Sequence, residues 1–353
     1  MGATDWLKLS LIPGIGDKTI TQLITAFGSP EAVLACGRGM LSPYLSAKQI
    51  DALLAGPDPA QLALSQEWLT REGQSLLTLT DPDYPLYLRE IADAPPLLYC
   101  LGRRELLNRP CLGIVGSRNA TPQGVRDAEA FATTLSCSGI TIVSGMALGI
   151  DAAAHRGGLQ GMGSSIAVVG TGLDRIYPAR NKALAHQLAE NGLLVSEFAL
   201  GTPPLPGHFP KRNRIISGLS RGVLVIEAAP DSGSLITARV AAEQGRDVFA
   251  IPGSIHSPLS RGCHALIKQG AKLVESALDV LEEMAWAMTT PPVIPGVIEP
   301  DLILDAMDAA PMTTDSIAER CGLTLDALSA KLLMLELEGR VATLPGGRYQ
   351  KLT

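Results

Sequence analysis

The stretch "GVLVIEAAPDSGSLITARVAAEQGRDVFAIPG", residues 222–253, decides the fold of this chain. It begins and ends with the runs "GVLVIEA" and "DVFAIPG", whose consecutive apolar residues are typical of strands buried on both faces. The segment between them, "SLITARVAAEQG", has a helical pattern. Strand, helix and strand in this order predict one unit of a parallel sheet whose faces are covered by helices.

The same alternation extends over residues 76–288, so we expect an α/β domain of that length. Four further apolar runs are predicted strands: "CLGIVGS" (111–117), "ITIVSG" (140–145), "SIAVVGTG" (165–172) and "LLVSE" (193–197). Several runs end in small residues, among them Gly116-Ser117 and Ser144-Gly145. Because ligands of open parallel sheets bind beyond the carboxyl ends of the strands, these endings predict a crevice at that edge.

Two smaller regions flank the predicted sheet domain. Residues 1–75 are predicted to form short helices around a Gly14–Gly16 turn, and they resemble a SAM-like or helix-hairpin-helix module. Residues 289–300, "TTPPVIPGVIEP", have the composition of a proline-rich linker. Residues 301–353 are predicted to form three helices and a β-hairpin around "PGG", which is the pattern of a winged helix.

The composition is that of a folded protein whose cysteines are reduced thiols. The chain has 353 residues, of which 46% are hydrophobic and 18% charged. No apolar run approaches the roughly 20 residues that span a bilayer, and the first residues lack the basic start of a signal peptide. The six cysteines form no C-x-x-C pair, so we expect buried reduced thiols and a cytoplasmic location rather than zinc or disulfides.

Charge is distributed unevenly along the chain. The whole sequence has 29 Lys and Arg against 35 Asp and Glu, yet residues 110–274 hold 15 against 10. Residues 1–75 carry a net charge of −2, which favours a structural or protein-contact role over DNA binding, although hairpin N–H groups can touch a phosphate. A basic middle domain between acidic flanks indicates one focused anion site.

The basic residues are concentrated in "GHFPKRNRIISGLS", residues 207–220. We expect Phe209-Pro210 to be an extended turn and Asn213 to cap a short helix, which places Lys211, Arg212 and Arg214 at a helix N-terminus. Cations are unfavourable there unless an anion binds, because the helix dipole is already positive. A solvated basic turn is the alternative, and the stretch alone does not decide between the two.

A second segment repeats this pattern. "YPARN" (177–181) and "FPKRN" (209–213) share the order aromatic-Pro-x-Arg-Asn, so Arg180 and Arg212 could meet phosphates at two helix N-termini. Arg118 follows the first strand, with Ser117 and Asn119 as hydrogen-bond partners. Arginine suits phosphate oxygens, and the two aromatic side chains could either stack on bases or pack in the core, with core packing favoured for the tyrosine.

Several other motifs and polar residues of the sequence have more than one interpretation. The sequence lacks both a complete G-x-G-x-x-G fingerprint and a P-loop, so a dinucleotide dehydrogenase or a P-loop NTPase is disfavoured. Asp151 and His155 could be an acid/base pair or metal ligands, but a cap and a hydrogen-bonded histidine are favoured. Glu197 and Glu227 close strands and could serve a glycosidic-bond hydrolase, and "APDSGSLIT" (229–237) could form an anion nest or a sugar-hydroxyl contact.

Taken together, the motifs resemble the DNA-processing protein A (DprA, also Smf) family over about residues 80–275. The segments that carry the resemblance are "GIVGSRNATPQG", "IVSGMALGIDAAAH", "AVVGTGLDRIYPARN", "HFPKRNRIISGLS", "VLVIEAAPDSGSLITARVAAEQGRDVFAIPG" and "GCHALIKQGA". The resemblance implies an extended Rossmann-like fold that binds and protects single-stranded DNA and loads the RecA recombinase during natural transformation. It further implies a homodimer without catalytic activity or cofactor, which makes no use of a membrane.

The resemblance also implies which residues contact DNA. These are Ser117 and Arg118, Ser144 and Gly145, and Lys211, Arg212 and Asn213, to which the basic pattern adds Arg180 and Arg214.

Two functional questions stay open. The alternative to a DNA-binding protein is a Rossmann-like nucleotide enzyme or sensor similar to the nucleotide N-glycosidases, although the Pro-Gly-Gly-x-Gly-Thr-x-x-Glu motif of those enzymes is absent. The winged-helix region 300–353 has a net charge of −3, and its third helix carries Asp326, Glu336 and Glu338 against Lys331. A helix this acidic favours a protein-contact or regulatory role over reading duplex DNA.

Overall fold

The computed structural model describes residues 3–284, 302–307, 312–323, 325–337, 340–344 and 348–351. The chain forms two compact units, Met1–Val293 and Ile294–Thr353, and each is considered by itself. The strands of the first unit are β1 (Gln74–Thr78), β2 (Leu97–Gly102), β3 (Cys111–Gly116), β4 (Thr141–Ser144), β5 (Ser165–Val168), β6 (Leu193–Ser196), β7 (Gly222–Ile226), β8 (Asp247–Ala250) and β9 (Lys272–Leu273). Among the described residues these nine strands form one sheet, in the order β1-β2-β6-β5-β4-β3-β7-β8-β9.

The six apolar runs predicted as strands are strands β3 to β8. They pair in parallel, and β3 lies between β4 and β7. Apart from Gly116, every residue of β3 to β7 is buried, as expected of strands covered on both faces. The predicted α/β fold with a parallel sheet is therefore confirmed. The sequence did not predict β1 and β2, which extend the sheet on one side by antiparallel pairing.

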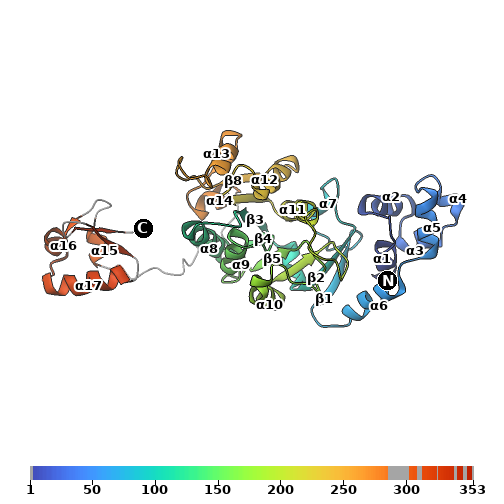
Figure 1. Cartoon of the computed structure of the whole chain (residues 1–353), viewed down its shortest axis with the longest axis horizontal. Coiled ribbons are helices and arrows are strands. Elements are labelled where there is room, and N and C mark those ends of the chain that lie inside the picture. Colours follow the sequence, from blue (N-terminus) through green and yellow to red (C-terminus); the bar gives the residue numbers. More distant parts are fainter. Residues whose placement is uncertain are drawn as a thin grey trace. The chain divides into compact units, whose positions relative to one another are not determined.

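Helices cover both faces of the sheet. On one face lie α8 (Pro122–Cys137), α9 (Ile150–Gly158), α10 (Lys182–Asn191) and α14 (Ala277–Glu283). On the other lie α7 (Leu86–Arg89), α11 (His208–Leu219), α12 (Gly233–Glu243) and α13 (Arg261–Lys268). Figure 1 shows α8, α9 and α10 in green on one side of the central strands and α11 and α12 in yellow on the other. Two short 3-10 turns, η1 (Arg104–Asn108) and η2 (Ala179–Asn181), complete the sheet region.

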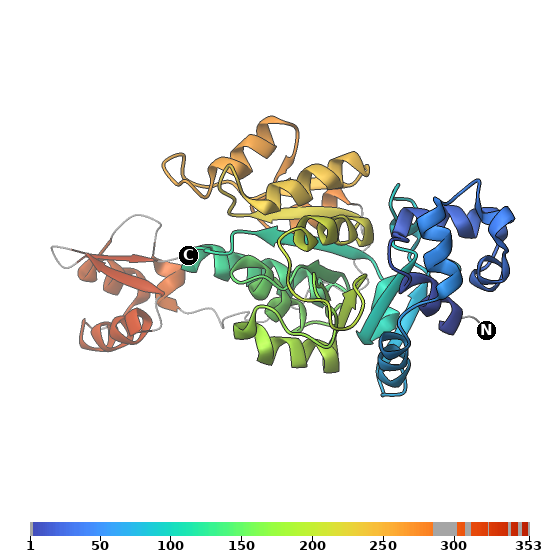
Figure 2. The ribbon, with the colours of Figure 1, turned by 45° about the vertical axis from the view of Figure 1, so that its right-hand side comes forward.

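The N-terminal helices share a core with the edge of this sheet. They are α1 (Ala3–Ser10), α2 (Asp17–Phe27), α3 (Pro30–Ala35), α4 (Arg38–Leu41), α5 (Ala47–Ala55) and α6 (Pro59–Trp68). Buried side chains of the helices pack with those of β1 and β2, and the rings of Trp68 and Tyr99 meet edge-to-face at 5.8 Å. Figure 2 shows the blue helices beside these two strands. The short helices around the Gly14–Gly16 turn are as predicted, and the boundary expected after residue 75 falls within β1.

The second unit has the elements of a winged helix. They are α15 (Leu302–Ala306), β10 (Met312–Thr313), α16 (Thr314–Cys321), α17 (Leu325–Leu337), β11 (Val341–Leu344) and β12 (Arg348–Lys351). β11 and β12 pair antiparallel, so the three predicted helices and the hairpin strands are confirmed. The "PGG" turn and the linker predicted at 289–300 lie outside the described residues.

The described residues also answer two expectations drawn from composition. None of the six cysteines, all of which lie in the described part of the chain, forms a disulfide; four of them (Cys36, Cys100, Cys111 and Cys263) are buried, whereas Cys137 and Cys321 are partly exposed. Within the parts of the chain that the structure describes, we find no helix with the length and apolar character required to traverse a bilayer.

His155 is a core residue of α9. Its side chain is fully buried and its Nδ1 lies 2.7 Å from the hydroxyl oxygen of Ser165 in β5, whereas its Nε2 has no partner among the described residues. Burial lowers the pKa of His155 to about 3, with further contributions from the charges of Arg212 and Arg156. The hydrogen-bonded histidine expected from the sequence is thus confirmed at one of its two nitrogens. Asp151 is not the cap expected from the sequence: the N-cap of α9 is Gly149, and the Asp151 carboxylate, in the first turn, accepts a hydrogen bond from the Ala147 N–H of the preceding loop.

The state of His155 predicts a pH dependence of stability. Because the ordinary pKa of about 6.5 applies to the unfolded chain, that chain binds one more proton than the folded one between pH 6.5 and 3. His155 should therefore make the free energy of unfolding fall by up to about 1.4 kcal/mol for each pH unit below 6.5. Urea unfolding of the wild type and His155→Asn across this range measures the difference in slope, with His256→Asn, at an exposed position, as the control. Equal slopes in the wild type and His155→Asn would contradict the assignment.

Candidate functional site

The chain reverses its direction across the sheet between β3 and β7. After β3 the next strands lie on one side of it, and β7 to β9 lie on the other. The loops that follow β3 and β7 diverge at such a point and leave a crevice. A hollow of about 640 Å³ lies there, lined by Gly116, Ser117 and Arg118 after β3 and by Ser232, Gly233 and Ser234 at the start of α12. The predicted crevice is therefore present, and the "APDSGSLIT" stretch lines it.

A smaller hollow of about 230 Å³ adjoins the first, since both are lined by Arg118, Tyr177, Phe209 and Arg212. The two differ in charge. Carboxylates line only the larger one, through Asp151 and Asp231, whereas the smaller one has both arginines and no acidic residue. The smaller hollow is therefore the part of the crevice best suited to an anion.

Arg212 is the most unusual group of the site. Its side chain is only 4% exposed, and its Nε and Nη1 have no hydrogen-bond partner among the described residues. Burial lowers the pKa of Arg212 to about 10, while the nearby Asp151 favours the charged form. The guanidinium is thus a buried cation at neutral pH, and a buried charge without partners is unfavourable unless a ligand supplies them.

Gly145 makes room for this guanidinium. A Cβ atom at position 145 would lie 1.7 Å from the Nη1 of Arg212, closer than any two such atoms can approach. Gly145 therefore acts through the position of Arg212. Ser144, its neighbour, is fully buried and donates its hydroxyl to the carbonyl of Ile114 at 2.6 Å, which joins β4 to β3 rather than lining either hollow.

Aromatic rings and a second arginine lie at the mouth of the hollows. The guanidinium of Arg118, an exposed residue, lies 5.7 Å from the ring centroid of Phe209. The ring of Tyr177 lies 5.7 Å from the same ring, and the Tyr177 side chain is 49% exposed. The expectation that Tyr177 packs in the core is therefore wrong, because half of its surface faces solvent beside the site.

Glu227 holds the loop that carries Arg118. Its backbone is in the left-handed region, with φ of 53°, and its carbonyl accepts a hydrogen bond from the Ser117 N–H at 2.7 Å. Its carboxylate accepts from the N–H and the hydroxyl of Thr121, and Gly124 leaves the space that this carboxylate occupies. Glu227, whose carboxylate was suggested for hydrolysis, thus fixes both ends of the 117–121 loop, Ser117 through its carbonyl and Thr121 through its carboxylate.

Helix α11 begins earlier than the sequence predicted. Its first residue is His208 and its N-cap is Gly207, so Phe209-Pro210 is part of the first turn and Asn213 is not a cap. Both expectations were wrong for one reason: proline is tolerated in a first turn, where its missing N–H has no helical partner. The basic residues accordingly lie one turn inside the helix instead of at its end.

This correction separates the cations of α11 into two groups. Arg212 lines the larger hollow, together with its neighbour Asn213. Arg214 instead donates through both Nη atoms to Glu197 at 2.9 Å and lies 3.0 Å from Asp93 through its Nε. Lys211 lies 2.7 Å from Asp17 of α2 and 3.0 Å from Glu197. The structure therefore places Arg214 and Lys211 in an ion-pair cluster and not among the residues that line the hollows.

The remaining predicted residues are placed as follows. Ser117 lines the larger hollow and accepts the Asn119 N–H at 3.1 Å. Arg180 is exposed in η2, next to the hollows but not among the residues that line them. Sequence reasoning missed Asn181, whose side-chain amide donates to the carbonyls of Met146 and Ala147 and so fixes the loop after β4. The sequence signal for Asn181 is the Arg-Asn pair that "YPARN" and "FPKRN" share.

Two family models and a curated relative match this chain over nearly its whole length. Residues 75–285 match the family model of DNA recombination-mediator protein A, and residues 289–347 match the DprA winged helix domain. Protein Smf of Escherichia coli is 42% identical over 97% of this chain and 94% of its own length.

Two solved structures are similar as well. The crystal structure of DNA processing protein A from Streptococcus pneumoniae is 41% identical, with a TM-score of 0.67, and the match covers 80% of this chain and 99% of that one. The structure of DNA processing protein A from Helicobacter pylori, described for its single-stranded DNA binding mode, is 31% identical over 60% of this chain and 95% of that one, with a TM-score of 0.55.

The packing of Gly145 against Arg212 leads to a prediction about anion binding. Pyrophosphate should stabilise the wild type against unfolding, by about 2.7 kcal/mol at 100 times its Kd. Gly145→Ala should keep the fold, because the atom that must move is the end of a long side chain, but should bind pyrophosphate about tenfold more weakly. Thermal unfolding at constant ionic strength measures both, with Gly39→Ala, where a Cβ meets nothing within 4 Å, as the control. Equal stabilisation of the wild type and Gly145→Ala would remove Arg212 from the anion site.

Proposed function

The chain belongs to the DNA recombination-mediator protein A (DprA/Smf) family, and from this premise we propose that it binds single-stranded DNA in the crevice between β3 and β7. The observation that carries the proposal is the buried guanidinium of Arg212, which has two donors without partners in a hollow that also contains Arg118. A phosphate of the DNA backbone supplies the missing acceptors and compensates the buried charge. The relative from Helicobacter pylori, described as binding single-stranded DNA, supports this choice of ligand.

We place the phosphate in the smaller hollow, because its lining has two arginines and no carboxylate. Phe209 and Tyr177 then provide ring faces for the neighbouring bases, which suits binding without strong sequence preference. Ser117 and Asn213 line the larger hollow and offer polar groups to the sugar and phosphate. Ser144 and Gly145 act indirectly, the first through the β3–β4 pairing and the second through the position of Arg212.

The other predicted cations take different parts in this proposal. Arg180 is exposed near the site and contacts the strand beyond the hollows. Arg214 stays with Glu197 and Asp93 as a support of α11, because its donors are already used in a buried pair. Lys211 binds phosphate only if it leaves Asp17 and Glu197, so its contribution is smaller than that of Arg118.

We further propose that the protein acts by binding and handing over DNA and not as an enzyme. The carboxylates considered for an N-glycosidase-like reaction have other partners, Glu197 in the cluster with Arg214 and Glu227 on Thr121. Family membership supports the finer assignments, which are loading of the RecA recombinase, a role in natural transformation, a homodimer and a cytoplasmic location. The acidic winged-helix unit is then a protein-contact or regulatory module.

Arg118→Ala tests the site directly. The variant should bind a labelled poly-dT oligonucleotide about tenfold more weakly, because a charge-assisted hydrogen bond contributes about 1.5–3 kcal/mol. The slope of log K against log salt should become less steep by about 0.7 for each lost phosphate contact on a single strand. Fluorescence anisotropy over a salt series measures both quantities, and Arg126→Ala, on the exposed side of α8, is the matched control.

The same assay separates the competing functions. Duplex DNA and nucleoside monophosphates should compete poorly with poly-dT, and the monophosphates should be recovered intact by chromatography. An unchanged salt slope in Arg118→Ala would remove this arginine from the site. Consumption of a monophosphate by the wild type would instead favour the nucleotide-enzyme alternative, and an unchanged slope in Lys211→Ala would leave Lys211 in its ion pairs.

The RecA assignment predicts a separate gain of activity. On poly-dT covered with single-stranded DNA-binding protein, the wild type should restore the DNA-dependent ATPase of RecA, because it delivers the recombinase to DNA that it holds. Arg118→Ala should lower this stimulation about tenfold at equal protein concentration, in proportion to its loss of affinity, whereas Arg126→Ala should match the wild type. Absence of stimulation by the wild type at concentrations that saturate the DNA would refute loading while leaving DNA binding intact.

A further inference from the structure

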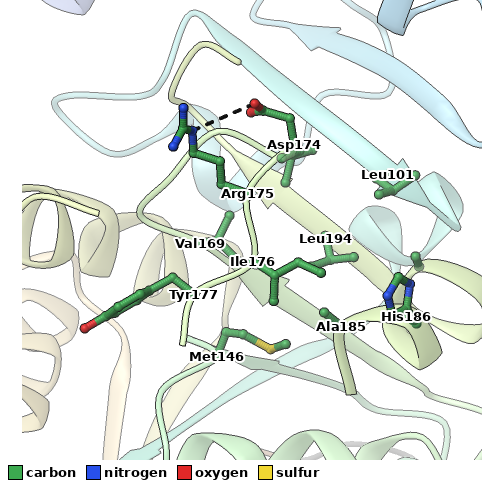
Figure 3. Close-up of a pocket in the computed structure, with 12 residues that line it drawn as sticks. Leu101, Met146, Val169, Asp174, Arg175, Ile176, Tyr177, Ala185, His186 and Leu194 are labelled. Atoms are coloured by element: carbon green, nitrogen blue, oxygen red, sulfur yellow. Dashed lines mark ion pairs between the residues drawn. The ribbon is translucent and has the colours of Figure 1, made fainter. Parts of the chain in front are cut away.

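A third cavity lies beside the two hollows of the site. It has a volume of about 160 Å³ and is found between α10, the end of β5, residues of β2 and β6, and the segment 173–177. Figure 3 shows Ile176 pointing into it, toward Met146, Ala185 and Leu194, while Tyr177 points away toward the other side. Apart from Tyr177, none of the residues proposed to contact DNA lines this cavity.

The cavity is apolar inside and polar at its edge. Its walls are formed chiefly by Leu101, Met146, Val169, Leu173, Ala185 and Leu194. The polar side chains that line it are Asp174, Arg175 and His186, and all three residues are exposed. A concave apolar site with a few polar groups at its edge is typical of sites for small planar ligands.

The segment that covers the cavity is held in place by hydrogen bonds. The carbonyl of Thr171 accepts from the buried hydroxyl of Ser196 at 2.6 Å, and the carboxylate of Asp174 accepts from the Gly201 N–H at 2.8 Å. The Gly172 N–H donates to the carbonyl of Thr202 at 3.1 Å. The cavity is therefore preformed, so a ligand does not have to pay the entropy of ordering its cover.

The cavity adjoins the proposed phosphate position. Met146 and Tyr177 line both the cavity and the 230 Å³ hollow that contains Arg118 and Arg212. A nucleotide whose phosphate lies on the two arginines thus has the cavity next to it, on the far side of the Tyr177 backbone. The segment that follows carries the exposed cations Arg180 and Lys182, which can accompany the backbone of the strand past this point.

Size decides what fits. An engineered apolar cavity of about 150 Å³ binds benzene, so a cavity of about 160 Å³ holds one six-membered ring. Resting on the proposed function, we propose that this cavity is a base-binding subsite that takes a single pyrimidine ring of the bound strand. Its occupant is a base and not an apolar side chain of a partner protein, because the cavity adjoins the cationic hollow. Binding of one base in this cavity adds a preference for pyrimidines to binding that is otherwise tolerant of sequence.

Two substitutions change the cavity in opposite directions. Ala189→Leu, on the part-buried face of α10 that lines it, fills the space. Ile176→Ala, at a residue that is 38% exposed and points inward, enlarges it. Ala183→Leu makes the same change as the first on an exposed position of α10 that does not line the cavity and is the matched control.

The test combines affinity with a signal from the base itself. A short poly-dT oligonucleotide with one 5-fluorodeoxyuridine is titrated with each full-length variant and followed by anisotropy and by ¹⁹F NMR. In the wild type and Ala183→Leu, the bound oligonucleotide should give a separate, shifted ¹⁹F resonance. Ala189→Leu should lose that resonance and bind poly-dT about tenfold more weakly, the effect of one lost base contact. Ile176→Ala should shift the ratio of poly-dA to poly-dT affinity about fivefold toward poly-dA, because the larger cavity admits a purine.

Each outcome decides between the alternatives. Retention of the shifted resonance and the poly-dT affinity in Ala189→Leu would overturn the subsite and leave the cavity for another partner. An unchanged affinity ratio in Ile176→Ala would overturn the size argument even if Ala189→Leu misfolds. Loss of binding in Arg118→Ala together with wild-type behaviour of both cavity variants would refute the subsite while supporting the proposed function. Absence of poly-dT binding by the wild type would refute both.

Discussion

A buried guanidinium without protein partners is the constraint on which the functional domain depends. Removing an ion from water costs several kcal/mol, and Arg212 recovers little of this from hydrogen bonds within the chain. The charge of Asp151 offsets part of the cost, and the absence of a side chain at Gly145 provides the space. The arrangement is stable because the rest of the sheet and α11 are firmly packed, and two donors of the guanidinium are left without a protein partner among the described residues.

The helix that carries Arg212 uses its charges on two faces. Lys211 and Arg214 are three residues apart and therefore lie on one face of α11, where Glu197 accepts both of them. Arg212 lies on a different face, toward the crevice. Asp17 adds a carboxylate from the N-terminal helices, so the acidic N-terminal region fixes the helix that presents Arg212. Part of the negative charge of the N-terminal region therefore stabilises α11.

The strands of the sheet could be predicted from the sequence because continuous apolar runs identify buried parallel strands. The edge strand β1 has only the apolar pair Leu76-Leu77, too short a run to identify a buried strand. β2 contains the run "LLYCL" (97–101) and could have been predicted as a strand, but a continuous run does not show that it pairs antiparallel with its neighbours. Among the site residues, Arg118, Arg212 and Gly145 were identified correctly as neighbours, since each follows a strand or a repeated motif. The sequence groups Lys211 and Arg214 with them because Pro210 predicts an interruption of the helix. In a helix that starts at His208, the spacing of Lys211 and Arg214 places these two residues on a different face from Arg212.

The positive character of the site comes from the placement of carboxylates more than from the number of cations. The carboxylate of Glu227 accepts a hydrogen bond from the Thr121 N–H. The backbone of Glu227 is in the left-handed conformation, which costs about 1–3 kcal/mol. Glu197 is directed to the opposite face of α11, and Asp151 and Asp231 line only the larger hollow. As a result, two arginines face the smaller hollow without an acidic residue among its lining groups, within a chain that is acidic as a whole. In the proposed function, the apolar cavity next to the cations favours a flexible single strand over a rigid polyanion, because only a strand with unpaired bases can bring both a phosphate and a ring into adjoining spaces.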